Sequence, residues 1–217
     1  MIRWRNRRGG AVFVALFAVG LVLPSAAGCT GRAGGADLSS SPSSLSPSVA
    51  GAAVAGGSAA LPGPVPDDLA LRPAPTDSPP APAVSGELTD GSPLALADLW
   101  AERPVVLTFF SSWCTLCAEQ QVAVSDLARA HADRVVFVGV AGEDTAEELQ
   151  AYLRQHRVGY PVLVDHDQTI WRSYAVREPP AVVLVARGGT LLRGFPGGVD
   201  AATLEAMLTD LVLAPAS

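Results

Sequence analysis

Residues 105–117 read Val-Val-Leu-Thr-Phe-Phe-Ser-Ser-Trp-Cys-Thr-Leu-Cys. The first six of these residues, apolar except for Thr108, have the length of a buried strand. The last four begin and end with cysteine, and residues 118–131, which follow, have the apolar periodicity of a helix. The stretch therefore predicts a buried strand that leads directly into a helix, with Cys114 and Cys117 at the junction.

This junction favours reactive thiols. A cysteine at a helix N-terminus faces unpaired backbone N–H groups and the positive end of the helix dipole, and both favour the thiolate form. Residues three apart lie on one helical face, so Cys117 can reach Cys114 and close a small disulfide ring. We expect Cys114 to act as the nucleophile and Cys117 to resolve the mixed disulfide, which requires accessible sulfur atoms.

Apolar runs and helical patterns alternate along the rest of residues 86–217. Thr145, followed three residues later by Glu148, predicts a capping box at the start of a helix. Strands are expected at residues 135–140, 161–164, 181–185 and 190–193, and helices at residues 145–156, 168–174 and 200–213. Alternation of this kind, ending in a hairpin and a helix, predicts one α/β domain with a mixed sheet.

In their order and spacing, these segments resemble the thioredoxin-like fold. Within that superfamily they most resemble the extracytoplasmic TlpA/ResA/DsbE-like branch, which includes the cytochrome c maturation reductases. Residues 87–99 are similar to the N-terminal hairpin extension of that branch, and residues 159–165 to the strand after its inserted helix. The resemblance implies a central mixed β-sheet flanked by helices. It also implies a thiol–disulfide oxidoreductase without cofactor or metal, acting on proteins in cytochrome c maturation or in envelope disulfide control.

The resemblance extends to the substrate groove. Residues 174–185 are similar to the segment that holds the family's cis-proline, which falls on Pro180. The residue before it is Pro179, which has no N–H, so one backbone hydrogen bond to an extended substrate should be missing.

The branch often has Glu where this chain has Gln120, and an amide cannot act as a base. We therefore expect the mixed disulfide to be resolved more slowly than in family members that have Glu at this position. We expect Trp113 to shield the disulfide.

The N-terminus predicts export. Residues 1–28 combine four arginines, an apolar run and small residues, which is the layout of a secretory signal. The Ala-Ala-Gly-Cys sequence that ends at Cys29 resembles the lipobox of bacterial lipoproteins, which implies an acylated Cys29 and an exported domain anchored to the outer face of the cell membrane. Ordinary cleavage near Ala27 and an uncleaved anchor are the alternatives. Residues 29–85, rich in Ser, Pro, Ala and Gly, predict a disordered tether.

Charge limits the possible partners. The chain of 217 residues has 15 Arg, no Lys and 21 acidic residues, which gives a net charge of −6. Loss of residues 1–28 would leave 11 basic against 21 acidic residues, a net charge of −10. Such a chain has no general attraction for nucleic acid. We expect a monomer that touches the membrane only through its lipid anchor, and that exchanges disulfides with protein thiols and with a membrane redox partner.

Three alternatives to thiol–disulfide exchange fit the sequence less well. Structural zinc needs four ligands, and the only histidines, His131, His156 and His166, are dispersed and expected at the surface. A thiol peroxidase resembling the peroxiredoxins would have its cysteine in a Pro-x-x-x-Thr/Ser-x-x-Cys setting. Ser111 fits that pattern, but the proline is missing and the close cysteine spacing favours dithiol exchange. A non-catalytic cell-surface binding module is the third, although so small a disulfide loop stabilises little.

Overall fold

The computed structural model describes residues 54–214. The predicted signal peptide, Cys29 and residues 29–53 of the predicted tether lie outside the described residues. Within residues 54–214, no helix combines the length and the apolar character needed to cross a membrane.

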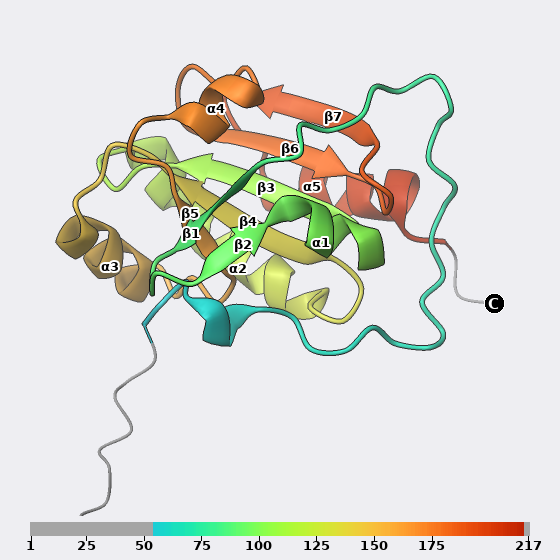
Figure 1. Ribbon diagram of the computed structural model, residues 1–217, viewed down its shortest axis with the longest axis horizontal. Helices are drawn as coiled ribbons and strands as arrows, with labels where there is room; N and C mark the ends of the chain where they lie inside the picture. Colours follow the sequence, from blue (N-terminus) through green and yellow to red (C-terminus); the bar gives the residue numbers. More distant parts are fainter. Residues whose placement is uncertain (1–53, 215–217) are drawn as a thin grey trace, which may run out of the picture. The chain divides into compact units, whose positions relative to one another are not determined.

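A seven-stranded sheet forms the centre of the domain, in the order β2-β1-β5-β4-β3-β6-β7 (Figure 1). Strands β3, β4 and β5 run parallel, whereas β1, β2, β6 and β7 pair in antiparallel fashion. The strands are β1 (Ser85–Leu88), β2 (Pro93–Ala95), β3 (Val105–Phe110), β4 (Val136–Ala141), β5 (Val162–Val164), β6 (Ala181–Val185) and β7 (Leu191–Pro196). The predicted α/β fold with a mixed sheet is confirmed.

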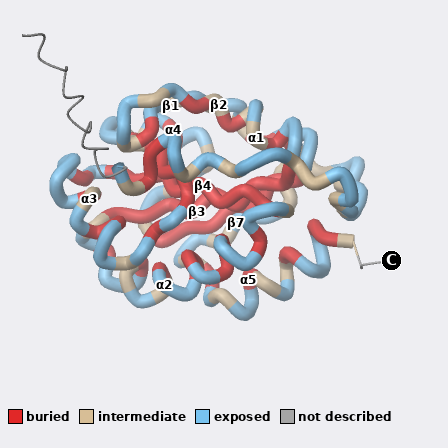
Figure 2. Tube along the Cα trace, turned by 90° about the horizontal axis from the view of Figure 1, so that it is seen from below, coloured by how far each residue is buried: buried red, intermediate tan, exposed pale blue. Residues whose placement is uncertain are grey.

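Helices cover both faces of this sheet because the central strands are apolar on both sides. All six residues of β3 are buried, and alternate side chains enter opposite cores. One core contains α2 (Thr115–Ala130), α3 (Ala146–Gln155), α5 (Ala201–Met207) and the π-helical turn η2 (Leu208–Val212). The other contains α1 (Leu96–Glu102) and α4 (Thr169–Ser173). Figure 2 shows the buried sheet between these two layers.

Side-chain caps define the starts of α2 and α3. At α3 the predicted capping box is present, because Thr145 Oγ1 accepts from Glu148 N at 3.3 Å and Glu148 Oε2 accepts from Thr145 N at 3.0 Å. Helix α2 begins at Thr115, three residues before the predicted start, because the Cys114 sulfur caps it. Short helix α1 follows the N-terminal hairpin β1–β2.

Residues 54–84, which we call the N-terminal strap, correct the predicted tether. They were expected to be disordered, but they run along the outside of the domain until they enter β1 (Figure 1). The strap includes one turn of 3₁₀ helix, η1 (Ser58–Ala60), and otherwise consists mainly of extended and turn backbone. The described fold therefore begins at residue 54 rather than at residue 86.

The strap binds mainly through backbone groups. Gly56 O accepts from Val162 N at 2.7 Å, and Pro79 O accepts from Leu191 N at 2.9 Å. Gly56 has a φ of 77°, and a Cβ there would lie 3.0 Å from Val162, so glycine allows this close approach. The guanidinium of buried Arg103 donates to Gly63 O of the strap. Disorder was predicted from the composition of this segment, which reflects its apolar side chains. The contacts that hold the strap need few such side chains.

Removal of the strap should destabilise the domain. A chain of residues 86–217 loses several backbone hydrogen bonds, each worth about 1 kcal/mol, and leaves buried Arg103 short of an acceptor. We expect its free energy of unfolding to fall by roughly 3–5 kcal/mol relative to residues 54–217. Urea unfolding followed by tryptophan fluorescence measures the difference. Equal midpoints would show that residues 86–217 are the complete folding unit.

Candidate redox site

Cys114 and Cys117 form a disulfide at the start of α2. In the chain, α2 follows the central strand β3 (Figure 1). Their Cα atoms are 5.2 Å apart. Cys114 is the N-cap of α2, and its sulfur accepts from Cys117 N at 3.0 Å. The first turn of α2 carries no acidic residue, so no carboxylate there opposes the positive end of the helix dipole.

The sulfur pair is less accessible than expected. Cys114 is 5% exposed and Cys117 is 3% exposed, whereas the flanking Trp113 and Leu116 are 59% and 44% exposed. The disulfide therefore lies at the domain surface but is nearly covered. Trp113 is not a core residue, and its shielding role stays a prediction.

The loop before Cys114 is tied to the loop after β4. Ser111 is buried and donates its hydroxyl to Gly142 O. Gly142 N donates to Phe110 O at 3.2 Å, and Ser112 N donates to Asp144 Oδ1 at 2.8 Å. Three hydrogen bonds thus fix the end of β3 against its parallel neighbour β4.

Asp144 is a site residue that the sequence analysis missed. It is 6% exposed, and burial raises the pKa of its carboxyl. The negative charges of Glu148 and Glu143 raise this pKa further, while the hydrogen bonds with Ser112 lower it. The available signal was topological, because the carboxyl ends of parallel strands β3 and β4 meet at one edge of the sheet.

The peptide bond between Pro179 and Pro180 is cis, at the position that the resemblance indicated. Pro180 is buried and directly precedes β6, a neighbour of β3. Gln120 extends to the same place, since a Cβ built on Gly198 would lie 2.8 Å from both Gln120 Oε1 and Pro180 Cγ. The structure therefore brings Gln120 and the cis-proline together, while Glu119 is exposed.

A groove of about 620 Å³ adjoins the cis-proline. Leu116 of α2 forms part of its wall, and Phe195 and Pro196 of β7 form another part. Pro179 and Pro180 also line it, so the groove meets α2 one residue before Cys117. An extended chain that lay in this groove would pass Pro179, which offers no N–H to it.

A buried polar cluster lies under α2. Gln121 Nε2 donates to Tyr160 OH at 2.6 Å, and Tyr160 OH lies 3.3 Å from Thr108 Oγ1 of β3. Burial raises the pKa of Tyr160. No acidic side chain is among the groups that bond with Tyr160 and Gln121 in the described structure, so this cluster supplies hydroxyl and amide groups only.

The histidines do not form a site. His131 is buried, contrary to its expected surface position, because its Nε2 lies 2.8 Å from Glu205 Oε2 and its Nδ1 lies 2.9 Å from Arg134. His166 is exposed. Within residues 54–214, no group of three or more His, Cys, Asp or Glu side chains is placed to hold a metal ion.

Comparison with known proteins gives a family match and related sequences. The model of the AhpC/TSA family matches residues 78–193. The soluble secreted antigen MPT53 of Mycobacterium tuberculosis is 32% identical over 100 residues, which cover 46% of this chain and 57% of that protein. The match therefore spans less than two thirds of MPT53. The thiol-disulfide oxidoreductase ResA of Bacillus anthracis is 23% identical over 120 residues, which cover 55% of this chain and 69% of ResA.

Solved structures agree with the fold. The structure of MTB dsbF in its mixed oxidised and reduced forms has a TM-score of 0.57 and 28% identity, and covers 62% of this chain and 98% of its own. A secreted Mycobacterium tuberculosis disulfide oxidoreductase homologous to E. coli DsbE has a TM-score of 0.52 and 26% identity, and covers 58% of this chain and 91% of its own. The predicted thioredoxin-like fold is confirmed.

Gly198 should be required for the geometry around Pro180. Gly198→Ala places a methyl group against Gln120 and Pro180 in a backbone with φ of 75°, so we expect a loss of about 1–3 kcal/mol of stability. Gly197→Ala is the matched control, because its φ is 84° but no atom lies within 4 Å of the added Cβ. Urea unfolding of both variants measures the difference. Equal losses would mean that backbone conformation alone matters.

Proposed function

The chain belongs to the AhpC/TSA family, and from this premise we propose that it is an extracytoplasmic thiol–disulfide oxidoreductase. The observation that carries the proposal is the Cys114–Cys117 disulfide at the N-terminus of α2, beside a groove lined by the cis-proline Pro180. A disulfide that closes so small a loop adds little chain-entropy stabilisation, so redox exchange is the better explanation of its position. The proteins named MPT53 and ResA support the assignment through their similarity.

The proposed exchange proceeds through a mixed disulfide. A substrate thiolate attacks the Cys114 sulfur, the Cys114–Cys117 bond breaks, and Cys117 leaves as a thiolate that takes up a proton. A second substrate thiolate then attacks the substrate sulfur in the mixed disulfide, and Cys114 leaves as a thiolate. The substrate gains a disulfide, while two electrons pass to Cys114 and Cys117. The reducing reaction runs the same steps in reverse. In both directions the positive end of α2 stabilises the Cys114 thiolate.

Protein substrates fit the surroundings of the disulfide. Exposed Trp113 and Leu116 flank the nearly covered sulfur pair, and exposed apolar side chains of this kind are typical of contact surfaces for proteins. The adjoining groove has room for an extended segment. Since exposed side chains change rotamer rapidly, a substrate that docks against Trp113 and Leu116 can uncover the Cys114 sulfur.

We place this activity outside the cytoplasm. The secretory layout of residues 1–28 and the lipobox-like sequence at Cys29 support export with a lipid anchor on the outer face of the cell membrane. The relative MPT53 is described as secreted, which agrees with export. A membrane redox partner would return Cys114 and Cys117 to their starting state, and envelope disulfide control or cytochrome c maturation would be the pathway served.

The two cysteines should behave differently when replaced. We expect Cys114→Ser to abolish exchange with a reduced or disulfide-bonded unfolded protein, because the reacting sulfur is gone. In the reducing direction, Cys117→Ser should retain the attack of the Cys114 thiolate on a substrate disulfide and accumulate a mixed disulfide on Cys114, since no resolving thiol remains. Mass spectrometry of the trapped adduct and a turnover assay measure these effects. Full activity in Cys114→Ser would favour the binding module, and faster turnover of peroxide than of disulfides would favour a peroxidase.

Gln120 should limit resolution of the mixed disulfide. We expect Gln120→Glu to speed this step about 10-fold or more, because a carboxylate beside Pro180 can accept and return the thiol proton where the amide cannot. Gln155→Glu makes the same chemical change on the exposed end of α3 and serves as the control. Stopped-flow decay of the mixed disulfide gives the rates. An unchanged rate in Gln120→Glu would mean that water already performs this proton transfer.

A further inference from the structure

Asp144 is the one ionisable group in the hydrogen bonds that hold the loop before Cys114. Of the three described bonds between this loop and the loop after β4, two join backbone or hydroxyl groups, and the third joins Ser112 N to Asp144 Oδ1 at 2.8 Å. Ser112 lies two residues before Cys114. A change in the charge of Asp144 therefore acts directly on the segment that positions the reactive sulfur.

The second oxygen of this carboxyl group is not satisfied. Asp144 Oδ2 is buried and has no hydrogen-bond partner among the described residues. A buried carboxylate with one unpartnered oxygen carries a substantial desolvation cost, whereas the neutral acid carries much less. The site therefore favours the neutral acid more than water does.

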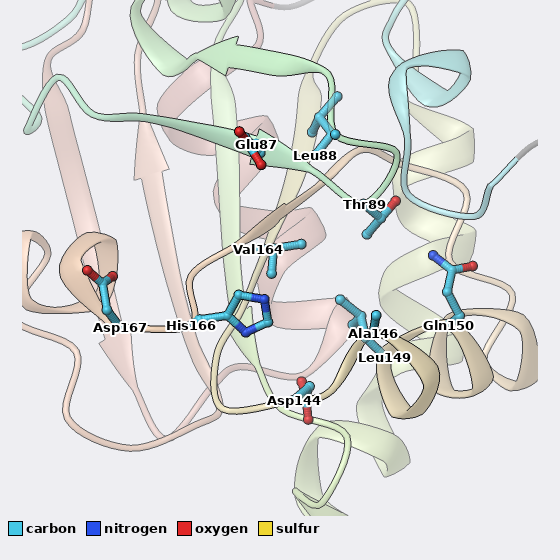
Figure 3. A pocket seen from close by; sticks show the side chains of 11 residues that line it. Glu87, Leu88, Thr89, Asp144, Ala146, Leu149, Gln150, Val164, His166 and Asp167 are labelled. Atoms are coloured by element: carbon cyan, nitrogen blue, oxygen red, sulfur yellow. The ribbon is translucent and has the colours of Figure 1, made fainter.

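The charges around Asp144 also favour the neutral form. Glu143 precedes it in the loop, and Glu148 faces it from the first turn of α3. A cavity of about 440 Å³ lies between Asp144, the β1 end and the loop before α4 (Figure 3). The other titratable groups that line this cavity are Glu87, His166 and Asp167. His166 is the only one of them that can become positive, and it is exposed.

We propose that Asp144 is a positioning residue for the disulfide loop, and that its ionisation makes the reactivity of Cys114 depend on pH. The inference rests on the proposed thiol–disulfide exchange. The ionised carboxylate makes a charge-assisted hydrogen bond to Ser112 N and fixes the loop. Its negative charge also opposes the thiolate at the nearby start of α2. The neutral acid binds Ser112 N more weakly and no longer opposes the thiolate.

Two substitutions separate position from charge. Asp144→Asn keeps an oxygen that can accept from Ser112 N but cannot ionise, whereas Asp144→Ala removes both the acceptor and the charge. Glu147→Gln is the matched control, because it removes one carboxylate from an exposed position three residues further along, in the first turn of α3. All variants are made in the full chain with Cys29→Ser, so that Cys114 and Cys117 are its only thiols.

The first measurement is the thiolate absorbance of the reduced protein against pH, together with its rate of exchange with oxidised glutathione. We expect the midpoint of the thiolate absorbance to move to lower pH by about 0.5–1 unit in Asp144→Asn, and the pH–rate profile to move with it. Glu147→Gln should move the midpoint by less than about 0.2 unit, because water and salt screen an exposed charge. Asp144→Ala should shift the midpoint similarly but should also lower the urea midpoint.

Folding stability gives a second readout that needs no exchange activity. Because burial raises the folded-state pKa of Asp144 above its ordinary value of 3.8, the folded protein holds this proton more tightly than the unfolded chain does. Stability contributed by the neutral acid is therefore present at low pH and falls as pH rises from about 3.8 through the folded-state pKa. In Asp144→Asn this fall should disappear, while Glu147→Gln should retain it.

The outcomes distinguish this inference from the proposed function. If the parent chain exchanges disulfides but Asp144→Asn matches Glu147→Gln in both thiolate midpoint and pH–rate profile, the role of Asp144 is overturned. If the parent chain exchanges no disulfide at any pH, the proposed function fails, and the absorbance and stability curves still test Asp144. A shifted midpoint in Asp144→Asn, with the urea midpoint retained, supports the inference.

Discussion

The end of strand β3 determines where the groups of the site lie. This strand is buried on both faces and is paired on both edges, with β4 and with β6, so its last residue cannot shift without disrupting the sheet. Cys114 follows four residues later as the N-cap of α2, and Cys117 lies within the helix. The parallel neighbour β4 leads to Asp144, and the antiparallel neighbour β6 begins directly after Pro180. Sheet pairing thus assembles side chains that are distant in the sequence.

Neutral and apolar groups surround the sulfur pair in an otherwise acidic chain. Trp113, Leu116 and the cis-proline segment present apolar surface, and Gln120 occupies the place beside Pro180 with an uncharged amide. The buried cluster around Tyr160 is likewise uncharged. Asp144 differs from these groups, because it can ionise; it lies in the loop after β4 and bonds to Ser112 N. Burial thus favours the neutral form of this one carboxyl group, whereas Arg177 and Glu178, the charged residues that line the groove, are exposed.

Much of the fold could be predicted because the signals were local. The apolar run of β3, the helical periodicity of α2 and the capping box of Thr145 each depend on neighbouring residues, and the structure confirms all three. The strap was missed because it binds through backbone carbonyls, which leave no trace in composition. Asp144 was missed because an acid before a helix is usually solvated, and only the sheet order shows that it is buried. His131 is buried by a partner 74 residues away.

The strap also limits the backbone N–H donors that the edge of the sheet presents to other molecules. Near the start of β7, strap residues Pro79 to Ala81 pair with residues 189–191. Prolines have no N–H, so this stretch offers few donors to an incoming strand, and Pro93 and Pro196 have the same effect in the two outermost strands. Under the proposed function, protein substrates would bring unpaired β-segments to this surface. Prolines at the edges of the sheet leave the groove beside the disulfide as the place where such a substrate can bind. They also discourage aggregation between the substrate and the edges of the sheet.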